Sequence, residues 1–172
     1  DIKDAEKLDK KGDELLKKFQ FQNAKEQYMK SQEKKIHCAE VYYQQSIYFN
    51  GVGEIKAAQS SLENCIKMNK TESKAYRDLG IHYASQNELD NARFNLEKSI
   101  ELNYSDSISH LHLGKVMILM KDFEDAEQHY LSAMDINPQF SECMVEMALL
   151  KLKMEQFQDA KKYYQEAKDI TP

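Results

Sequence analysis

An alanine recurs every 34 residues along the whole sequence. These alanines are Ala24, Ala58, Ala92, Ala126 and Ala160, and the interval never slips. Equal intervals in succession are hard to obtain by chance, and a constant period of roughly 20 to 50 residues is typical of proteins built from stacked repeats. The period therefore limits the chain to an array of similar structural units before any other feature is considered.

Each alanine can be counted as the twentieth residue of a 34-residue unit. Residues at the same position of successive units, called a column below, are then similar in size at several other positions. The eighth residue is small: Gly12, Ser46, Gly80, Gly114 and Ala148. The seventeenth is bulky and apolar: Phe21, Ile55, Leu89, Phe123 and Phe157. The twenty-fourth is Tyr28, Leu62, Leu96, Tyr130 or Tyr164, and the twenty-seventh is again small. Alternating small and large columns indicate closely packed helices, so we expect Gly114 and Ala126 to face each other.

Composition favours helices throughout. Val occurs four times and Thr twice, whereas Ala, Leu, Lys, Glu and Gln are abundant. Residues 107–120 and 123–136 each carry apolar residues at three- and four-residue spacing, which predicts two amphipathic helices joined by a short turn. Asn69, Asn103 and Asn137 each follow a predicted second helix, and we expect them to close it in a left-handed conformation.

The small eighth residue, the twentieth alanine, the later aromatic residue and the terminal proline of some units resemble the tetratricopeptide repeat. The resemblance covers repeats 5–38, 39–72, 73–106, 107–140 and 141–172, after an N-terminal extension of residues 1–4. The tryptophan that the family often has at the fourth position is replaced by Leu8, Tyr42, Tyr76, His110 and Met144. The resemblance implies an all-α fold, a right-handed α-solenoid of about ten helices in antiparallel hairpins, whose first helices line a concave groove.

Residues suited to catalysis or metal binding are scattered. No two of Cys38, Cys65 and Cys143 have metal-ligand spacing, and Gly51-Val52-Gly53 is too short to indicate a phosphate loop. A composite metal site of His110, His129 and Cys143 stays open beside the simpler interpretation that these side chains are packed or solvated. We therefore predict no enzyme activity, no metal site and no cofactor.

Charge and hydropathy limit the classes of partner that the chain is expected to bind. Only the first repeat is net positive in a chain of net charge −5, so no cationic stripe follows the array and nucleic acid is not expected. The longest apolar run, residues 116–120, is far shorter than the ~20 residues of a membrane span, and no direct membrane insertion is expected. Few cysteines favour a reducing, cytoplasmic setting. The start at Asp1, without Met or a signal-peptide pattern, predicts a piece of a longer protein.

The resemblance implies that the second, fifth, sixth and ninth residues of each first helix line the groove. The expected peptide-binding residues are Tyr43, Gln44, Ile47, Lys74, Arg77, Asp78, Ile81, Ile108, Leu111, His112, Lys115, Val145 and Leu149. Their apolar members predict that the groove binds an amphipathic helix or an extended segment. Ile81 and Leu149 have a second interpretation, in which they pack between neighbouring first helices.

The function we predict is a non-catalytic protein-interaction scaffold or adaptor that binds a protein or peptide partner within an intracellular multiprotein assembly. A chaperone adaptor is disfavoured. The family's clamp for a chaperone's C-terminal carboxylate corresponds to Asp9, Asp13, Gln44, Lys74 and Asp78, where only Lys74 matches and three carboxylates repel such a ligand. A substrate-recruiting arm of a multidomain enzyme is a third hypothesis. Self-association through the last repeat, which lacks a polar capping helix, is a further expectation.

Overall fold

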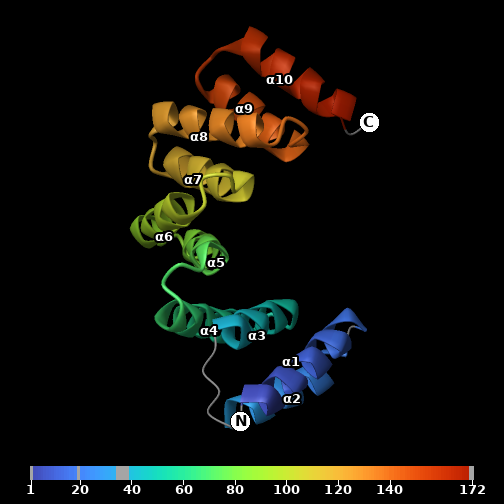
Figure 1. The fold of residues 1–172 in the computed structure, drawn as a ribbon. Helices are drawn as coiled ribbons and strands as arrows, with labels where there is room; N and C mark the ends of the chain where they lie inside the picture. Colours follow the sequence, from blue (N-terminus) through green and yellow to red (C-terminus); the bar gives the residue numbers. More distant parts are fainter. Residues whose placement is uncertain (1, 19, 34–38, 171–172) are drawn as a thin grey trace. The chain divides into compact units, whose positions relative to one another are not determined.

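The chain is described by a computed structural model that covers residues 2–18, 20–33 and 39–170 (Figure 1). These residues form ten α-helices and no strands, which confirms the all-α fold class and the series of helical hairpins. The helices are α1 (Ile2–Lys17), α2 (Phe21–Glu33), α3 (Ala39–Gly51), α4 (Ile55–Met68), α5 (Ser73–Ser85), α6 (Leu89–Leu102), α7 (Ser107–Leu119), α8 (Phe123–Ile136), α9 (Ser141–Lys153) and α10 (Phe157–Ile170). Cys38 and Pro172 lie outside the described residues.

The chain divides into two compact units, unit 1 (residues 1–79) and unit 2 (residues 80–172), and the boundary falls within α5. In unit 1, α1 packs on α2 and α3 packs on α4, and α2 contacts α3. In unit 2, α7 packs on α8 and α9 on α10, while α6 contacts α7 and α8 contacts α9. Helix α1 begins at Ile2, within the predicted N-terminal extension. None of the helices in the described part is long and apolar enough to cross a membrane.

The five repeated alanines are all buried, each on the second helix of its hairpin. A Cβ atom added to Gly80 would lie 2.7 Å from Cγ of Leu96 and 3.1 Å from the carbonyl oxygen of Ala92. Gly114 is similarly close to Tyr130. At Gly114 the nearest atoms belong to the Tyr130 ring, one helical turn beyond Ala126, the residue that the sequence predicts to face it. The glycine column therefore makes room for the bulky twenty-fourth residue.

Among the described residues, those with a left-handed backbone lie at the tips of the hairpins. Asn87, Lys121 and Glu155 have φ angles of 60°, 66° and 60°, each in the short turn between the two helices of a repeat. The prediction of left-handed Asn69, Asn103 and Asn137 is wrong, because their φ angles are −134°, −147° and −129°. The carboxamide of Asn69 instead accepts a hydrogen bond from the backbone N–H of Thr71 at 3.0 Å, and this local bond holds the turn between repeats.

Candidate functional site

The predicted groove residues all lie on the first helices of their repeats. Tyr43, Gln44 and Ile47 are on α3, Lys74, Arg77, Asp78 and Ile81 on α5, Ile108, Leu111, His112 and Lys115 on α7, and Val145 and Leu149 on α9. Residues three and four apart share one side of a helix, so each helix presents its members together. The residues up to Asp78 belong to unit 1, and those from Ile81 onward belong to unit 2.

In unit 1 the structure brings together Tyr43, Arg77 and Asp78. The Tyr43 hydroxyl donates to Oδ2 of Asp78 at 2.8 Å, and Nε of Arg77 donates to Oδ1 of the same carboxylate at 2.8 Å. Burial raises the pKa of Tyr43 above its usual range, and the charge of Asp78 adds to this shift. These side chains bind one another and join α3 to α5. Lys74 and Ile47 are exposed beside them, and Gln44 donates to Glu40.

In unit 2 the polar part of the site is the Lys115 ammonium group, which pairs with two carboxylates. The Nζ atom of Lys115 lies 2.8 Å from a carboxylate oxygen of Glu142 and 3.2 Å from one of Glu146. Burial by itself lowers the pKa of Lys115, but the hydrogen bonds to both carboxylates outweigh it and the pKa is raised. One cation between two carboxylates leaves this end of the α7–α9 surface with a surplus negative charge.

The apolar part of the site in unit 2 is exposed on α7 and α9. The exposed fractions of Ile108, Val145 and Leu149 are 41%, 38% and 48%. Leu149 also lines an open pocket of about 230 Å³ between the two helices. The walls of this pocket, called the α7–α9 pocket below, are Lys115, Ile118, Leu119, Glu146, Leu149, Leu150 and Lys153. A lining that combines exposed apolar side chains with charged ones is typical of a small protein-binding surface.

Leu111 does not take part in this surface. Its exposed fraction is 1%, and it belongs to the buried core of unit 2 together with Leu113 and Met147. The expectation of Leu111 as an exposed groove residue is therefore wrong. Ile81 is half-buried and packs against the same core, as its second interpretation suggested. Leu149 is exposed instead of packed between first helices.

Four residues that line the α7–α9 pocket were not predicted from the sequence: Ile118, Leu119, Leu150 and Lys153. A signal for three of them existed. Ile118 and Leu119 lie three and four residues after Lys115, and Lys153 lies four residues after Leu149, so the helical period extends the predicted face by one turn. The predicted set ended at the ninth residue of each repeat and stopped short of this turn.

The histidine and cysteine candidates fall into separate environments. Nδ1 of His110 lies 3.3 Å from Nδ1 of His129, whereas Sγ of Cys143 donates to the carbonyl oxygen of Tyr130 at 3.5 Å. Burial raises the pKa of the Cys143 thiol to about 12. Within the described ranges, no group of three His, Cys, Asp or Glu side chains is placed to hold a metal ion.

Comparison with known proteins bears on the repeats and the fold. The family model described as tetratricopeptide repeat matches residues 141–172. No curated protein matches the sequence. A crystal structure of MamA is 23% identical, has a TM-score of 0.85 and aligns over 92% of this chain and 93% of its own. A structure of PilF from Pseudomonas aeruginosa is 19% identical, with a TM-score of 0.86 over 99% of this chain and 78% of that one.

A third match is the crystal structure of YrrB, described as a TPR protein with an unusual peptide-binding site. It is 17% identical and has a TM-score of 0.80 over 96% of this chain and 85% of that one. At such identities the likeness is one of fold. Residues 141–172 are thus a tetratricopeptide repeat, and the chain as a whole has the fold of the tetratricopeptide-repeat proteins.

Proposed function

We propose that this chain is a non-catalytic interaction scaffold that binds a protein or peptide partner on the side of its first helices. The observation that carries the proposal is the α7–α9 pocket, where Leu119 and Leu149 expose apolar surface in a lining that also holds Lys115, Glu146 and Lys153. Apolar surface that remains open in a folded domain is a common mark of protein-binding sites. A pocket of about 230 Å³ is below the size of most small-molecule sites, which span roughly 300–1,000 Å³, and suits a single apolar anchor side chain.

The charges around the pocket favour one class of partner segment. Lys115, Glu142 and Glu146 together carry a surplus negative charge at one end, whereas Lys153 is at the other end. An amphipathic helix or extended segment with a basic residue on one side of an apolar anchor and an acidic residue on the other complements both ends. This complementarity fixes the direction in which the segment binds.

The polar clusters on the first helices support a binding role over a catalytic one. Tyr43, Arg77 and Asp78 satisfy one another, and both Glu142 and Glu146 are held by Lys115. The chaperone-adaptor alternative gains no support, because Asp78 accepts two hydrogen bonds as an anion where the family's clamp has a cation. Titration with a peptide ending in acidic residues tests that alternative, and we expect no saturable binding.

The proposal extends to the assembly in which the chain acts and to contacts between copies of the chain. We propose that the chain acts within an intracellular multiprotein assembly, without nucleic acid as a partner. Self-association is proposed through the far side of the last repeat, where Tyr164 is exposed and, with Val145 and Lys168, borders a shallow pocket of about 170 Å³. Sedimentation at increasing protein concentration tests this part, and Tyr164→Glu should abolish any dimer seen.

The α9 helix offers a matched pair for testing the binding surface. Leu149 and Leu152 are both 48% exposed, but only Leu149 lines the α7–α9 pocket. A partner is first identified by affinity capture from cell extract and mass spectrometry, and its dissociation constant is then measured with purified proteins. Leu149→Glu should weaken binding by about tenfold or more, because a carboxylate replaces an apolar anchor contact. Leu152→Glu should change it less than about twofold, and equal effects of the two substitutions would contradict the proposal.

A further inference from the structure

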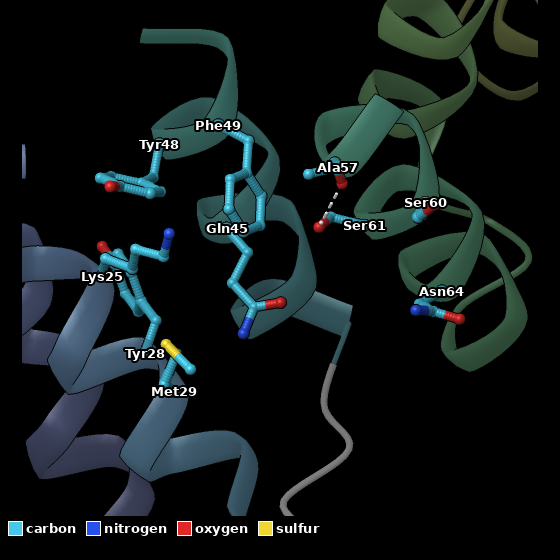
Figure 2. Close-up of a pocket in the computed structure, with 10 residues that line it drawn as sticks. All are labelled: Lys25, Tyr28, Met29, Gln45, Tyr48, Phe49, Ala57, Ser60, Ser61 and Asn64. Carbon is cyan, nitrogen blue, oxygen red and sulfur yellow. Dashed lines mark hydrogen bonds between the residues drawn. The ribbon is translucent and has the colours of Figure 1, made fainter. Parts of the chain in front are cut away.

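A second pocket, of about 230 Å³, lies in unit 1 between α2, α3 and α4, and none of the predicted groove residues lines it. One wall comes from Tyr28 and Met29 of α2, the next from Gln45 and Phe49 of α3, and the last from α4, including Asn64. Figure 2 shows the Gln45 side chain between the side chains of α2 and those of α4. We call this space the α2–α4 pocket.

The feature that sets this pocket apart is the carboxamide of an almost fully buried residue, Gln45, which no described residue pairs with. Gln45 is only 6% exposed, and its side chain makes no hydrogen bond to any residue that the structure describes. Asn64, on the facing wall, likewise has no side-chain partner within the described ranges. Buried polar side chains are nearly always hydrogen-bonded, because an unsatisfied one lowers the stability of the fold. The buried Gln45 and the half-buried Asn64, both unpaired and lining one pocket, indicate a ligand that pairs with them.

The chemistry of the walls defines that ligand. A carboxamide offers one acceptor and two N–H donors, so it pairs with a peptide group through both the peptide N–H and the peptide C=O. Two other polar groups are already engaged: the Ser61 hydroxyl donates to the carbonyl oxygen of Ala57 at 2.9 Å, and Lys25 pairs with Glu54 at 3.7 Å. The buried Tyr48 hydroxyl, which also lines the pocket, has no hydrogen-bond partner among the described residues. With its lysine paired, the pocket favours an uncharged ligand.

The rest of the α2–α4 pocket has an apolar side, and on its α4 side the residues are small enough for a ligand to come close to the helix. Met29 is half exposed and, with the Phe49 ring, offers a surface for one aliphatic or aromatic side chain. Ala57 and Ser60 are small and lie along α4, so a ligand backbone can approach this helix closely. We propose that the α2–α4 pocket binds an extended segment of another polypeptide. Its peptide groups pair with Gln45 and Asn64, and one uncharged apolar side chain packs against Met29 and Phe49.

The probe for this site is the blocked pentapeptide acetyl-Ala-Ala-Leu-Ala-Ala-amide, titrated into the whole 172-residue chain. Binding is followed by NMR on the side-chain NH₂ signals of Gln45 and Asn64 and on the methyl signal of Met29. We expect all three to shift with one saturation curve. The same peptide with Asp in place of Leu should bind more weakly, and 3-methylbutan-1-ol, which has the branched side chain without peptide groups, should leave the NH₂ signals unshifted.

Two substitutions remove the hydrogen-bonding groups and keep the side-chain volume close to the original. Gln45→Met and Asn64→Leu should each weaken pentapeptide binding by about 5- to 100-fold, the range expected when a ligand peptide group is left unsatisfied. Gln158→Met, at an exposed position on α10, is the matched control and should bind as the wild type does. If Gln45→Met loses helicity, Asn64→Leu on the half-buried wall of α4 decides the question.

Three outcomes would overturn the assignment: unchanged binding to a folded Gln45→Met, NH₂ signals that respond equally to the alcohol, or a pentapeptide that shifts no signal of this pocket. The proposal stands apart from the interaction surface of unit 2. Leu149→Glu should leave pentapeptide binding at the α2–α4 pocket unchanged, so failure of one site and failure of the other are distinguished.

Discussion

The ring of Tyr130 fills the space that the missing side chain of Gly114 leaves between α7 and α8. Tyr130 is fully buried, and its ring carbons are the nearest atoms to the place where a Gly114 Cβ would stand. The same arrangement joins Gly12 to Tyr28 in unit 1. A glycine inside a helix costs about 1 kcal/mol of helix propensity relative to alanine, so its presence here is explained by the close approach of the ring.

Gly114→Ala should therefore destabilise unit 2 although alanine is the better helix former. The added methyl group meets a ring that is enclosed on all sides, and overpacking of this kind costs about 1–3 kcal/mol. The free energy of unfolding from urea titration measures the effect. In a Tyr130→Ala background the ring is gone, and the same Gly114→Ala change should be neutral or stabilising. An equal loss in both backgrounds would refute the steric explanation.

The repeat register could be predicted from sequence because every column serves one packing role. The bulky residues of the seventeenth column are the first residues of α2, α4, α6, α8 and α10. The conformation at the turns could not be predicted in the same way. Asparagine tolerates a left-handed conformation better than lysine, which is why the sequence predicts it at Asn137, yet the positive φ angle is found at Lys121 in the hairpin tip and not at Asn137 between repeats.

The exposure of individual groove residues was harder to predict than the helices. Leu111 and Val145 occupy the same position in successive repeats, but Leu111 is buried and Val145 is exposed. The difference arises from neighbours, since α7 contacts α9 and Leu111 shares a buried cluster with Cys143 and Met147 of α9, whereas no further first helix follows α9 in the described part of the chain. Helical period assigns a residue to a face, and the next repeat decides whether that face is covered.

A buried lysine connects α8, α9 and the turn that follows. Nζ of Lys151 lies 2.6 Å from Glu127 and 2.8 Å from Oε1 of Gln156, and the Lys151 side chain is almost fully buried. Lys151→Ala should lower the free energy of unfolding by about 1–3 kcal/mol, because it leaves the Glu127 carboxylate without its charge-assisted hydrogen bond. The control is Lys162→Ala, which breaks an exposed pair with Glu166 and should cost less than about 0.5 kcal/mol. Equal losses would mean that Lys151 contributes no more than a surface charge.

The two described cysteines should be unreactive in the folded chain. Cys65 and Cys143 are fully buried, and burial raises the pKa of Cys143 to about 12, so almost no thiolate is present at pH 8. Alkylation by iodoacetamide, followed by mass spectrometry in a Cys38→Ser background, should be at least about 100-fold slower than alkylation of free cysteine. Urea should restore the ordinary rate at both positions. Rapid labelling of Cys143 without urea would show that α9 opens frequently.

The paired histidines of unit 2 should make its stability depend on pH. The carbonyl oxygen of Tyr104 can only accept, so Nε2 of His110, 3.1 Å away, carries a proton, and Nδ1 of His110 accepts from His129 at 3.3 Å. A second proton on His110 would face that N–H donor. Burial lowers the pKa of both histidines, and the charge of His110 further lowers that of His129. The hydrogen bond of His110 to the Tyr104 carbonyl oxygen and the nearby carboxylates of Asp106 and Asp125 oppose these shifts without reversing them.

The sign of the effect follows from proton binding. Below the usual histidine pKa of about 6.5, the unfolded chain binds protons that the folded pair does not, so the free energy of unfolding falls as the pH is lowered from 7 to 5. Ordinary carboxylates titrate near pH 4 and contribute little in this window. Urea titrations at pH 7, 6 and 5 should show the loss, and His129→Gln should reduce it. Because both states hold neutral histidines at higher pH, a slope that persists between pH 7.5 and 8.5, or one that His129→Gln leaves unchanged, would assign the dependence to other groups.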